Sequence, residues 1–264
     1  MCKIYSTGIY SKRSGSVPAP EGAVYVGRPS VWGNPYATDD WGQGDAANLF
    51  YGYALDRLAQ YPKWLDPLKG KSLVCWCKSK PTDKTPCHAE WLQHLAEERK
   101  DYCWEDDPFV RYLRLEEIGG NLFDYSVICI PTNGIVGRNG LIMGAGVALA
   151  AKNLCPVLPK VWGAWVQKYG NIPCRYYSKQ LDKTFISFPT KDNFKENSTY
   201  SLIGESAWYL RRLVEEELPE GQKVYLPAVG SGLGGLDYNL VKNILNLFLG
   251  NSAGSKYIIV LGGK

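Results

Sequence analysis

Hydrophobic residues in the N-terminal part of the chain alternate between short continuous runs and helically spaced stripes. The runs AVYVG at 23–27 and SLVCWC at 72–77 have the length and composition of buried strands. Apolar residues recur at helical spacing over 45–60 and over 89–98. The pattern therefore predicts a part of the chain in which strands and helices alternate.

The same alternation continues beyond a charged stretch at 97–108. Compact apolar runs predict strands at 126–131, 184–190, 223–230 and 257–262. Helical spacing predicts helices at 144–153, at 201–217 and after Asp237.

The last predicted helix carries the clearest stripe. Its apolar residues stand at i, i+3, i+4 and i+7, and they are Val241, Ile244, Leu245 and Phe248. Asp237 precedes them in the position of a residue that caps the first turn. We expect a helix with one buried face.

The charged stretch divides the chain. We place a domain boundary near residue 107, which gives an N-terminal domain at 1–106 and a C-terminal domain at 107–264. Alternating strands and helices are typical of a layered α/β fold, in which ligands bind at the carboxyl ends of the strands. Both domains are expected to be α/β, the first smaller and Rossmann-like.

Composition adds limits rather than a function. The chain has 264 residues, of which 45% are hydrophobic and 21% charged. Its net charge of +4 suits an anionic ligand, but the sequence lacks the dense run of lysines and arginines that is typical of a duplex-binding groove. No apolar run approaches the ~20 residues of a membrane span, and the N-terminus lacks the apolar core of a signal peptide. With eight cysteines at no disulfide-scaffold spacing, we expect a cytoplasmic protein with no membrane partner.

Two glycine-rich loops follow predicted strands and precede predicted helices. They are LIMGAGVA at 141–148 and GSGLGGL at 230–236. Residues without Cβ let the backbone approach a ligand, and a helix N-terminus attracts anions, so each loop is a candidate cradle for a phosphate. Two such loops indicate a diphosphate. The alternative is that the glycines only make tight strand-to-helix turns.

The stretches that contain these loops resemble the macrodomain family. VICIPTNGIVGRNGLIMGAGVALAAK at 127–152 is similar to the first half of its signature, and VYLPAVGSGLGGLDY at 224–238 to the second half. FPTKDNF at 188–194 places the resemblance nearest the branch that contains the macrodomain of DarG, a bacterial antitoxin that removes ADP-ribose from DNA thymidine, and related small bacterial ADP-ribose-binding proteins. The resemblance implies a three-layer α/β/α domain with a mixed sheet.

The resemblance also implies a function. It indicates a nucleotide-binding protein that takes an NAD metabolite, ADP-ribose or an ADP-ribosylated substrate, and needs no cofactor for it. Its activity would be that of an ADP-ribosyl hydrolase acting at the distal ribose, with DNA thymidine as the substrate to which ADP-ribose is attached. Two alternatives remain open: an ADP-ribose-binding protein without turnover, and a hydrolase or phosphatase of a small derivative such as the 1″-phosphate or a cyclic ADP-ribose signal.

Individual roles follow from the matching positions. Lys191 falls on the catalytic lysine, as a base or as a nucleophile toward an opened ribose, and Asn133 on the asparagine that contacts the distal ribose. Lys191 has the alternatives of a solvated lysine or a phosphate contact, and Asn133 that of a turn residue. Asn121 stands where many macrodomains have the aspartate that recognises adenine. The residues of the two loops that match ligand-binding positions are Met143, Gly144, Ala145, Gly146, Val147 and Ala148, and Gly230, Ser231, Gly232, Leu233, Gly234, Gly235 and Leu236.

One loop position departs from a related branch. Macrodomains that cleave ADP-ribose from glutamate have an aspartate where this chain has Gly234. The lysine–aspartate pair is therefore absent. This disfavours cleavage of glutamate-linked ADP-ribose by that pair.

The N-terminal part resembles domain of unknown function family 4326. The resemblance rests on VYVGRPSVWGNPY at 24–36, LVCWC at 73–77 and CHAEWL at 87–92. Within the first motif, Arg28 and Ser30 are candidates for a phosphate contact, or parts of a rigid turn above Trp32.

Four soft donors cluster in the other two motifs. Cys75 and Cys77 would share one face of a strand, and Cys87 and His88 begin the next predicted helix. Together they could ligate zinc, although adjacent Cys-His differs from the spacing of common zinc folds. A reactive thiol and ordinary core packing are the alternatives.

Overall fold

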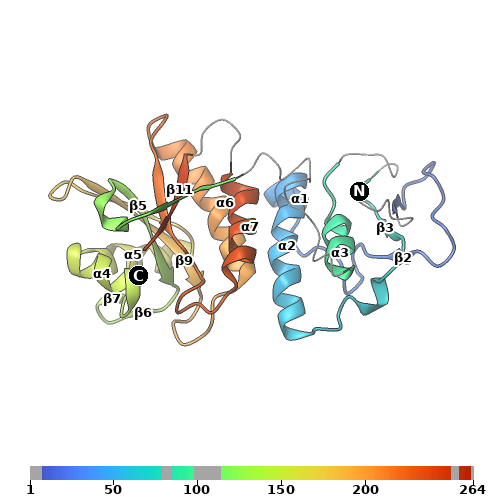
Figure 1. The fold of residues 1–264 in the computed structure, drawn as a ribbon, viewed down its shortest axis with the longest axis horizontal. Coiled ribbons are helices and arrows are strands. Elements are labelled where there is room, and N and C mark those ends of the chain that lie inside the picture. Colours follow the sequence, from blue (N-terminus) through green and yellow to red (C-terminus); the bar gives the residue numbers. More distant parts are fainter. Residues whose placement is uncertain (1–7, 79–84, 98–113, 251–255, 263–264) are drawn as a thin grey trace. The chain divides into compact units, whose positions relative to one another are not determined.

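The chain folds into two compact units. In a computed structural model, residues 8–78, 85–97, 114–250 and 256–262 are described (Figure 1). The units comprise Met1–Cys103 and Trp104–Lys264. The boundary expected near residue 107 lies outside the described residues.

The N-terminal unit is built on a small parallel sheet. Its strands β1 (Ile9–Ser11), β2 (Val24–Tyr25) and β3 (Leu73–Cys75) lie in the order β1-β3-β2. The helices are α1 (Thr38–Trp41), α2 (Gln43–Gln60), the short η1 (Asp66–Leu68) and α3 (His88–Ala96). The strands expected at 23–27 and 72–77 and both expected helices are confirmed. The sequence did not reveal β1, because three residues are too few to establish a periodicity.

The core of this unit lies between the sheet and the helices. Phe50 of α2, Leu73 of β3 and Leu92 of α3 are fully buried in one cluster. Trp32 packs against the same cluster and donates its indole N–H to the Trp64 carbonyl at 3.1 Å. The unit is α/β, as expected.

The C-terminal unit is built on a six-stranded mixed sheet. Its order is β4-β11-β10-β5-β9-β8, parallel except for the antiparallel pair β8–β9. The strands are β4 (Glu116–Gly119), β5 (Val127–Asn133), β8 (Arg175–Ser178), β9 (Lys183–Lys191), β10 (Val224–Pro227) and β11 (Tyr257–Leu261), and a hairpin adds β6 (Val136–Gly137) and β7 (Gly140–Leu141).

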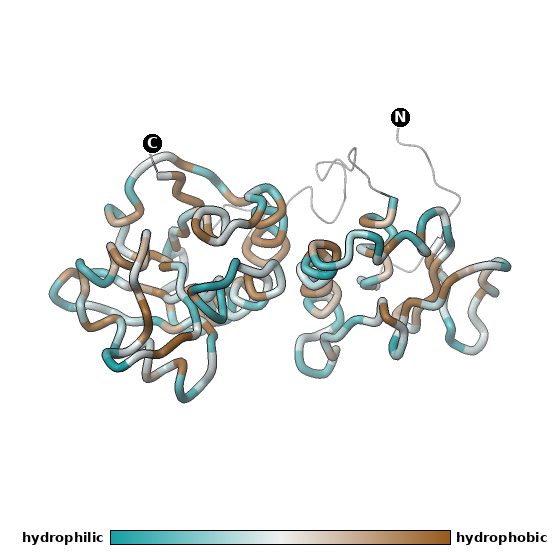
Figure 2. The backbone as a smooth tube through the Cα atoms, turned by 90° about the horizontal axis from the view of Figure 1, so that it is seen from below, coloured by the Kyte–Doolittle hydropathy of each residue, from teal (hydrophilic) through white to brown (hydrophobic). Residues whose placement is uncertain are grey.

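Helices cover both faces of this sheet. Figure 1 shows α4 (Gly146–Leu154) and α5 (Leu158–Tyr169) on one side and α6 (Tyr200–Glu217) and α7 (Tyr238–Leu249) on the other, while η2 (Leu122–Asp124) follows β4. The central strands β5 and β9 are buried along almost their whole length, as in sheets that are covered on both faces. Apolar segments accordingly run through the interior of the unit (Figure 2). The three-layer α/β/α fold with a mixed sheet is confirmed.

The sequence patterns did not predict six elements of this unit, namely β4, η2, β6, β7, α5 and β8. The edge strand β4 has the sequence EEIG and is mostly exposed, and β8 is a short antiparallel edge strand. Helix α5 contains Pro159 and Gly163, both poor helix formers. A Cβ at Gly163 would lie 2.8 Å from the Leu141 backbone nitrogen, so the close approach of α5 to the β6–β7 hairpin requires glycine there.

Helix α7 agrees with its prediction in detail. Val241, Ile244, Leu245 and Phe248 are all buried. The Asp237 carboxylate accepts hydrogen bonds from the Asn239 and Leu240 backbone N–H groups at 2.8 and 3.2 Å. The N-terminus of α7 is therefore neutralised by its own capping residue.

Among the described residues, no helix combines the length and the apolar character that crossing a membrane requires.

The Asp237 cap makes a testable contribution to stability. Asp237→Ala removes two hydrogen bonds to helix N–H groups and should lower the free energy of unfolding by about 1 kcal/mol. Urea unfolding followed by circular dichroism measures the change. Glu220→Ala, at an exposed carboxylate outside the helices, serves as the control and should stay within about 0.5 kcal/mol of the parent. Equal stability of the two variants would contradict the assigned cap.

Candidate functional site

A cavity of about 620 Å³ lies where the parallel strands β5, β9 and β10 end. Both glycine-rich loops contribute to its wall. The sequence-predicted residues that line it are Asn133, Gly144, Ala145, Gly146, Val147, Ala148, Lys191, Gly230, Gly232, Leu233 and Gly234. Its size lies within the range of small-molecule sites, and its position is the usual ligand position in α/β sheets.

Strand pairing brings Lys191 and Asn133 together. In the parallel pair β5–β9, a register shift after Thr132 makes Asn133 the partner of Lys191 at the last position of both strands. Residues that end neighbouring parallel strands lie at the same edge of the sheet. Two positions 58 residues apart therefore become neighbours on the cavity wall.

The Lys191 ammonium spans the mouth between a strand and a loop. Its Nζ donates to the Leu233 carbonyl oxygen at 2.7 Å. The backbone is held from the other side, since Asn171 Nδ2 donates to the Lys191 carbonyl at 2.9 Å and to Asp192 Oδ1 at 3.0 Å. The lysine is thus fixed at both ends, while its Nζ faces a cavity that a ligand can enter.

The Asn133 side chain holds the loop that follows β5. Its Oδ1 accepts from the Ile135 N–H at 2.9 Å, and its Nδ2 donates to the Ile142 carbonyl at 2.8 Å. Asn133 therefore does act as a turn residue, which was the alternative interpretation of this position. An amide retains a second N–H and a second lone pair, so the same group can also bind a ligand hydroxyl.

The first glycine loop leads into a helix end that faces the cavity. Ala145 is the N-cap residue of α4, and no side chain of the described residues caps this helix. The first turn carries no acidic residue. A Cβ at Gly144 would meet nothing within 4 Å, so the backbone is open to the cavity at this point. The unpaired N–H groups and the positive end of the helix dipole form a place for an anion.

The second loop differs from the first. Its glycines Gly230 and Gly235 have φ of +72° and +74°, and the loop closes on itself through the Leu236 N–H, which donates to the Gly230 carbonyl at 3.1 Å. Since Asp237 caps α7, the helix after this loop has no free anion site of its own. The two loops therefore differ, since the first leads into an uncapped helix end and the second presents a folded backbone to the same cavity.

Gly234 is required by the packing of the second loop. A Cβ there would lie 2.1 Å from the Gly230 carbonyl oxygen and 2.5 Å from Ser198 Oγ. Any side chain, including the aspartate of the related branch, would have to displace the loop backbone.

Five sequence-predicted residues do not line the cavity. They are Asn121, Met143, Ser231, Gly235 and Leu236.

Two of these residues have structural roles elsewhere in the unit. Met143 is buried in the core below the loop. The Asn121 amide accepts from the Phe123 N–H at 3.2 Å and caps η2 at the end of β4, an edge strand.

Eight cavity residues were not anticipated, namely Pro131, Thr132, Ile142, Thr190, Phe194, Ser198, Pro227 and Ala228. Two of them, Ser198 and Phe194, have features that favour a ligand. Ser198 is 4% exposed, and its hydroxyl has no hydrogen-bond partner among the described residues. Phe194 is 45% exposed at the rim. An unpaired buried hydroxyl and an exposed aromatic ring are both features of ligand sites. Phe194 lies in the FPTKDNF motif, but the sequence contains no signal for the inward orientation of Ser198.

A second cavity, of about 330 Å³, lies in the N-terminal unit. Arg28 lines it together with Cys75, Cys77 and His88. The four soft donors predicted by the sequence do come together, because the ligand atoms of Cys75, Cys77, Cys87 and His88 all lie within 4.8 Å of one another.

The Gly27–Ser30 segment forms a turn. The Ser30 N–H donates to the Gly27 carbonyl at 2.9 Å, and Trp32 packs in the core after it. The rigid-turn interpretation is therefore supported. Arg28 still faces the small cavity, whereas Ser30 does not line it.

Thiol chemistry separates the cysteines into two groups. Hydrogen bonds from Cys75 and Cys87 lower the pKa of the Cys77 thiol, while contacts with Cys75 and Cys77 raise that of Cys87. In the C-terminal unit, burial raises the pKa of Cys129, and it raises that of Cys174 to about 12. These C-terminal thiols are inert core residues.

The packing of Gly234 gives a stability prediction. Gly234→Ala should lower the free energy of unfolding by about 1–3 kcal/mol, because its Cβ would overlap the Gly230 carbonyl. The matched control is Gly232→Ala, where a Cβ meets nothing within 4 Å and the expected change is below about 0.5 kcal/mol. Scanning calorimetry of both variants measures the difference. Identical transitions for the two would show that the loop yields without cost.

Comparisons with known proteins address each unit separately. Residues 9–98 match the family described as "Domain of unknown function (DUF4326)". A search of curated proteins gives no match.

Among solved structures, the macrodomain of Mycobacterium tuberculosis DarG is 23% identical, with 57% of this chain and 97% of that chain covered and a TM-score of 0.47. The macrodomain of Thermus aquaticus DarG is 23% identical, with coverage of 57% and 98% and a TM-score of 0.46. Thermosipho africanus DarTG, solved in complex with ADP-ribose, is 26% identical, and the match spans 56% of this chain but only 42% of that chain, with a TM-score of 0.46. The chain thus joins a region that matches the DUF4326 family to a C-terminal α/β/α region that is similar to macrodomains.

Proposed function

We propose that the C-terminal unit binds ADP-ribose in the 620 Å³ cavity. The observation that carries the proposal is the uncapped N-terminus of α4 on the same cavity as Lys191 and Asn133. An anion held by helix N–H groups next to an amide and an amine matches a diphosphate joined to a sugar.

The parts of the cavity suit different parts of this ligand. The segment from Gly144 to Val147 lies at the positive helix end and would take the diphosphate. Asn133 and Lys191, at the strand ends, would face the distal ribose, where hydroxyl groups need both donors and acceptors. The buried Ser198 hydroxyl gives one more polar contact to a ligand that fills the cavity.

We further propose that the protein hydrolyses an ADP-ribosyl bond at the distal ribose. The bond between C1″ and the leaving group breaks, water supplies the hydroxyl at C1″, and the remaining proton goes to the leaving group. Lys191 is the catalytic group, because it is the ionisable side chain on the cavity wall. Its hydrogen bond to the Leu233 carbonyl uses one N–H of the ammonium, and loss of another proton would leave a lone pair for proton transfer or for C1″.

The substrate class follows from the lysine and from Gly234. The resemblance of FPTKDNF to the DNA-directed branch favours ADP-ribosylated thymidine as the substrate. The absence of room for an aspartate at Gly234 disfavours the lysine–aspartate route to glutamate-linked ADP-ribose.

A second candidate is ADP-ribose binding without turnover. The observation that favours it is the 2.7 Å hydrogen bond between Lys191 Nζ and the Leu233 carbonyl. If this bond persists in the complex, the lysine closes the cavity rather than acting on the ribose.

A negative charge introduced at the N-terminus of α4 should weaken ligand binding without lowering the stability of the fold. Ala145→Asp adds a favourable N-cap, which stabilises the helix by about 1 kcal/mol, and places a carboxylate where the diphosphate is proposed to lie. Isothermal titration with ADP-ribose should give saturable heat for the parent and at least ~10-fold weaker binding for this variant, a loss of about 1.4 kcal/mol.

The neutral cap Ala145→Ser is the control. It should retain most of the affinity, because it caps the helix without adding charge. Absence of heat for the parent at high ligand concentration would refute the proposed ligand. Equal affinity of Ala145→Asp and the parent would refute the position of the diphosphate.

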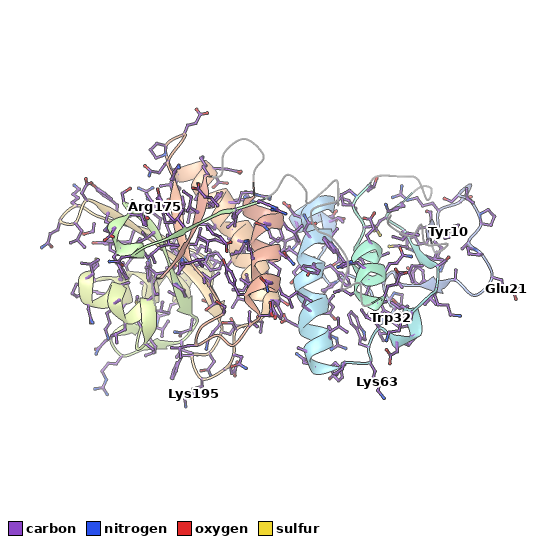
Figure 3. All side chains as sticks on the ribbon, in the orientation of Figure 1. Tyr10, Glu21, Trp32, Lys63, Arg175 and Lys195 are labelled. Atoms are coloured by element: carbon purple, nitrogen blue, oxygen red, sulfur yellow. The ribbon has the colours of Figure 1, made fainter. Side chains whose placement is uncertain are left out.

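Lys191→Ala should abolish release of ADP-ribose while leaving binding within a few fold of the parent. The assay uses single-stranded DNA with ADP-ribosylated thymidine, with ADP-ribose 1″-phosphate as a second substrate. Lys195→Ala is the matched control, since Lys195 lies on the loop that follows β9 and points away from its unit (Figure 3). Parent activity that survives in Lys191→Ala would exclude Lys191 as the catalytic group. An inert parent that binds ADP-ribose would select the second candidate.

A further inference from the structure

We propose that the N-terminal unit holds a zinc ion between Cys75, Cys77, Cys87 and His88. Cys75 is the last residue of β3, and Cys77 lies two positions later in the bend that follows this strand. The other two form the N-cap and the first residue of α3. The site therefore joins a strand to a helix that follows it by more than ten positions in the chain.

The distances fit a tetrahedral ion. With Zn–S of about 2.3 Å and Zn–N of about 2.0 Å, ligand atoms around zinc lie roughly 3.5–3.8 Å apart. Cys75 Sγ lies 3.4 Å from Cys77 Sγ and 3.8 Å from His88 Nδ1, and all four ligand atoms lie within 4.8 Å of one another. Small rotations of the side chains bring all four to bonding distance of one point.

The histidine is held in the form that binds a metal. His88 Nε2 lies 2.9 Å from the Val26 carbonyl oxygen, which can only accept, so Nε2 carries the proton. In the neutral ring the Nδ1 lone pair then faces the cysteine sulfurs. A backbone carbonyl on the far nitrogen is the usual second contact of a zinc-bound histidine.

The surroundings favour a metal over ordinary packing. Cys75, Cys87 and His88 are at most 3% exposed, and Cys77 is half-buried. His88 Nδ1 contacts Cys75 Sγ at 3.8 Å, and sulfur is a weak hydrogen-bonding partner that a zinc ion would replace with a ligand bond. Sulfur and imidazole ligands in a tetrahedral arrangement select zinc among the common divalent ions.

The ion would be structural. Four protein ligands fill the tetrahedral shell and leave no open position for a substrate. Since Cys75, Cys77 and His88 line the 330 Å³ cavity beside Arg28, the ion would set the shape of that cavity by fixing β3 against α3. Loss of zinc should therefore loosen the N-terminal unit and leave the cavity of the C-terminal unit unaffected.

Elemental analysis of the full chain, purified without chelators, tests the site. We expect one zinc per chain in the parent and less than a tenth of that in Cys77→Ser and in His88→Ala. Cys174→Ser, which alters a buried cysteine of the C-terminal unit, is the matched control and should keep its zinc. Less than half an equivalent of zinc in the parent, or iron in its place, would overturn the proposal.

A second measurement covers variants that fail to fold. The parent is stripped with a chelator and titrated with Co²⁺, whose absorption reports thiolate ligands and tetrahedral geometry directly. We expect a thiolate-to-cobalt band that saturates at one equivalent and disappears when zinc is added back. Titration without such a band would overturn the proposal whatever the variants do. Because ADP-ribose binding is measured separately in the other unit, failure of this site and failure of the proposed function are distinguishable.

Discussion

The parallel pairing of β5 with β9 is the constraint on which the C-terminal site depends. Both strands are buried on both faces, and their ladder runs to Asn133 and Lys191 through a single register shift. Side chains alternate faces along a strand, so the register at the strand ends decides which of them reach the cavity. The lysine and the asparagine are far apart in the sequence, and the pairing of their two strands brings them side by side.

The two helices that follow the glycine-rich loops differ at their N-termini. The N-terminus of α4 is uncapped and faces the cavity, while that of α7 is occupied by Asp237. An uncapped helix end costs stability, so its retention at a cavity wall points to a ligand that supplies the missing acceptors. The second glycine loop contributes shape instead, because the space around Gly234 admits no side chain.

The N-terminal unit uses a different means of stabilisation. Its sheet has only three short strands, which bury less surface than the six-stranded sheet of the other unit. A metal that joins β3 to α3 would add a strong local constraint to this small core. Val26 directly follows β2, and its carbonyl contacts His88. Through this contact, β2 would also be held to the ion.

The sequence by itself determined the α/β class, the main strands and helices, the Asp237 cap and the residues that could carry chemistry. Their patterns are local, because burial, periodicity and capping depend on neighbours within a few positions. Only the tertiary structure decided that Ser198 faces the cavity, that Asn121 and Met143 do not, and that β4 and α5 exist. These outcomes depend on contacts between distant segments, such as the approach of α5 to the β6–β7 hairpin at Gly163, which no local pattern records.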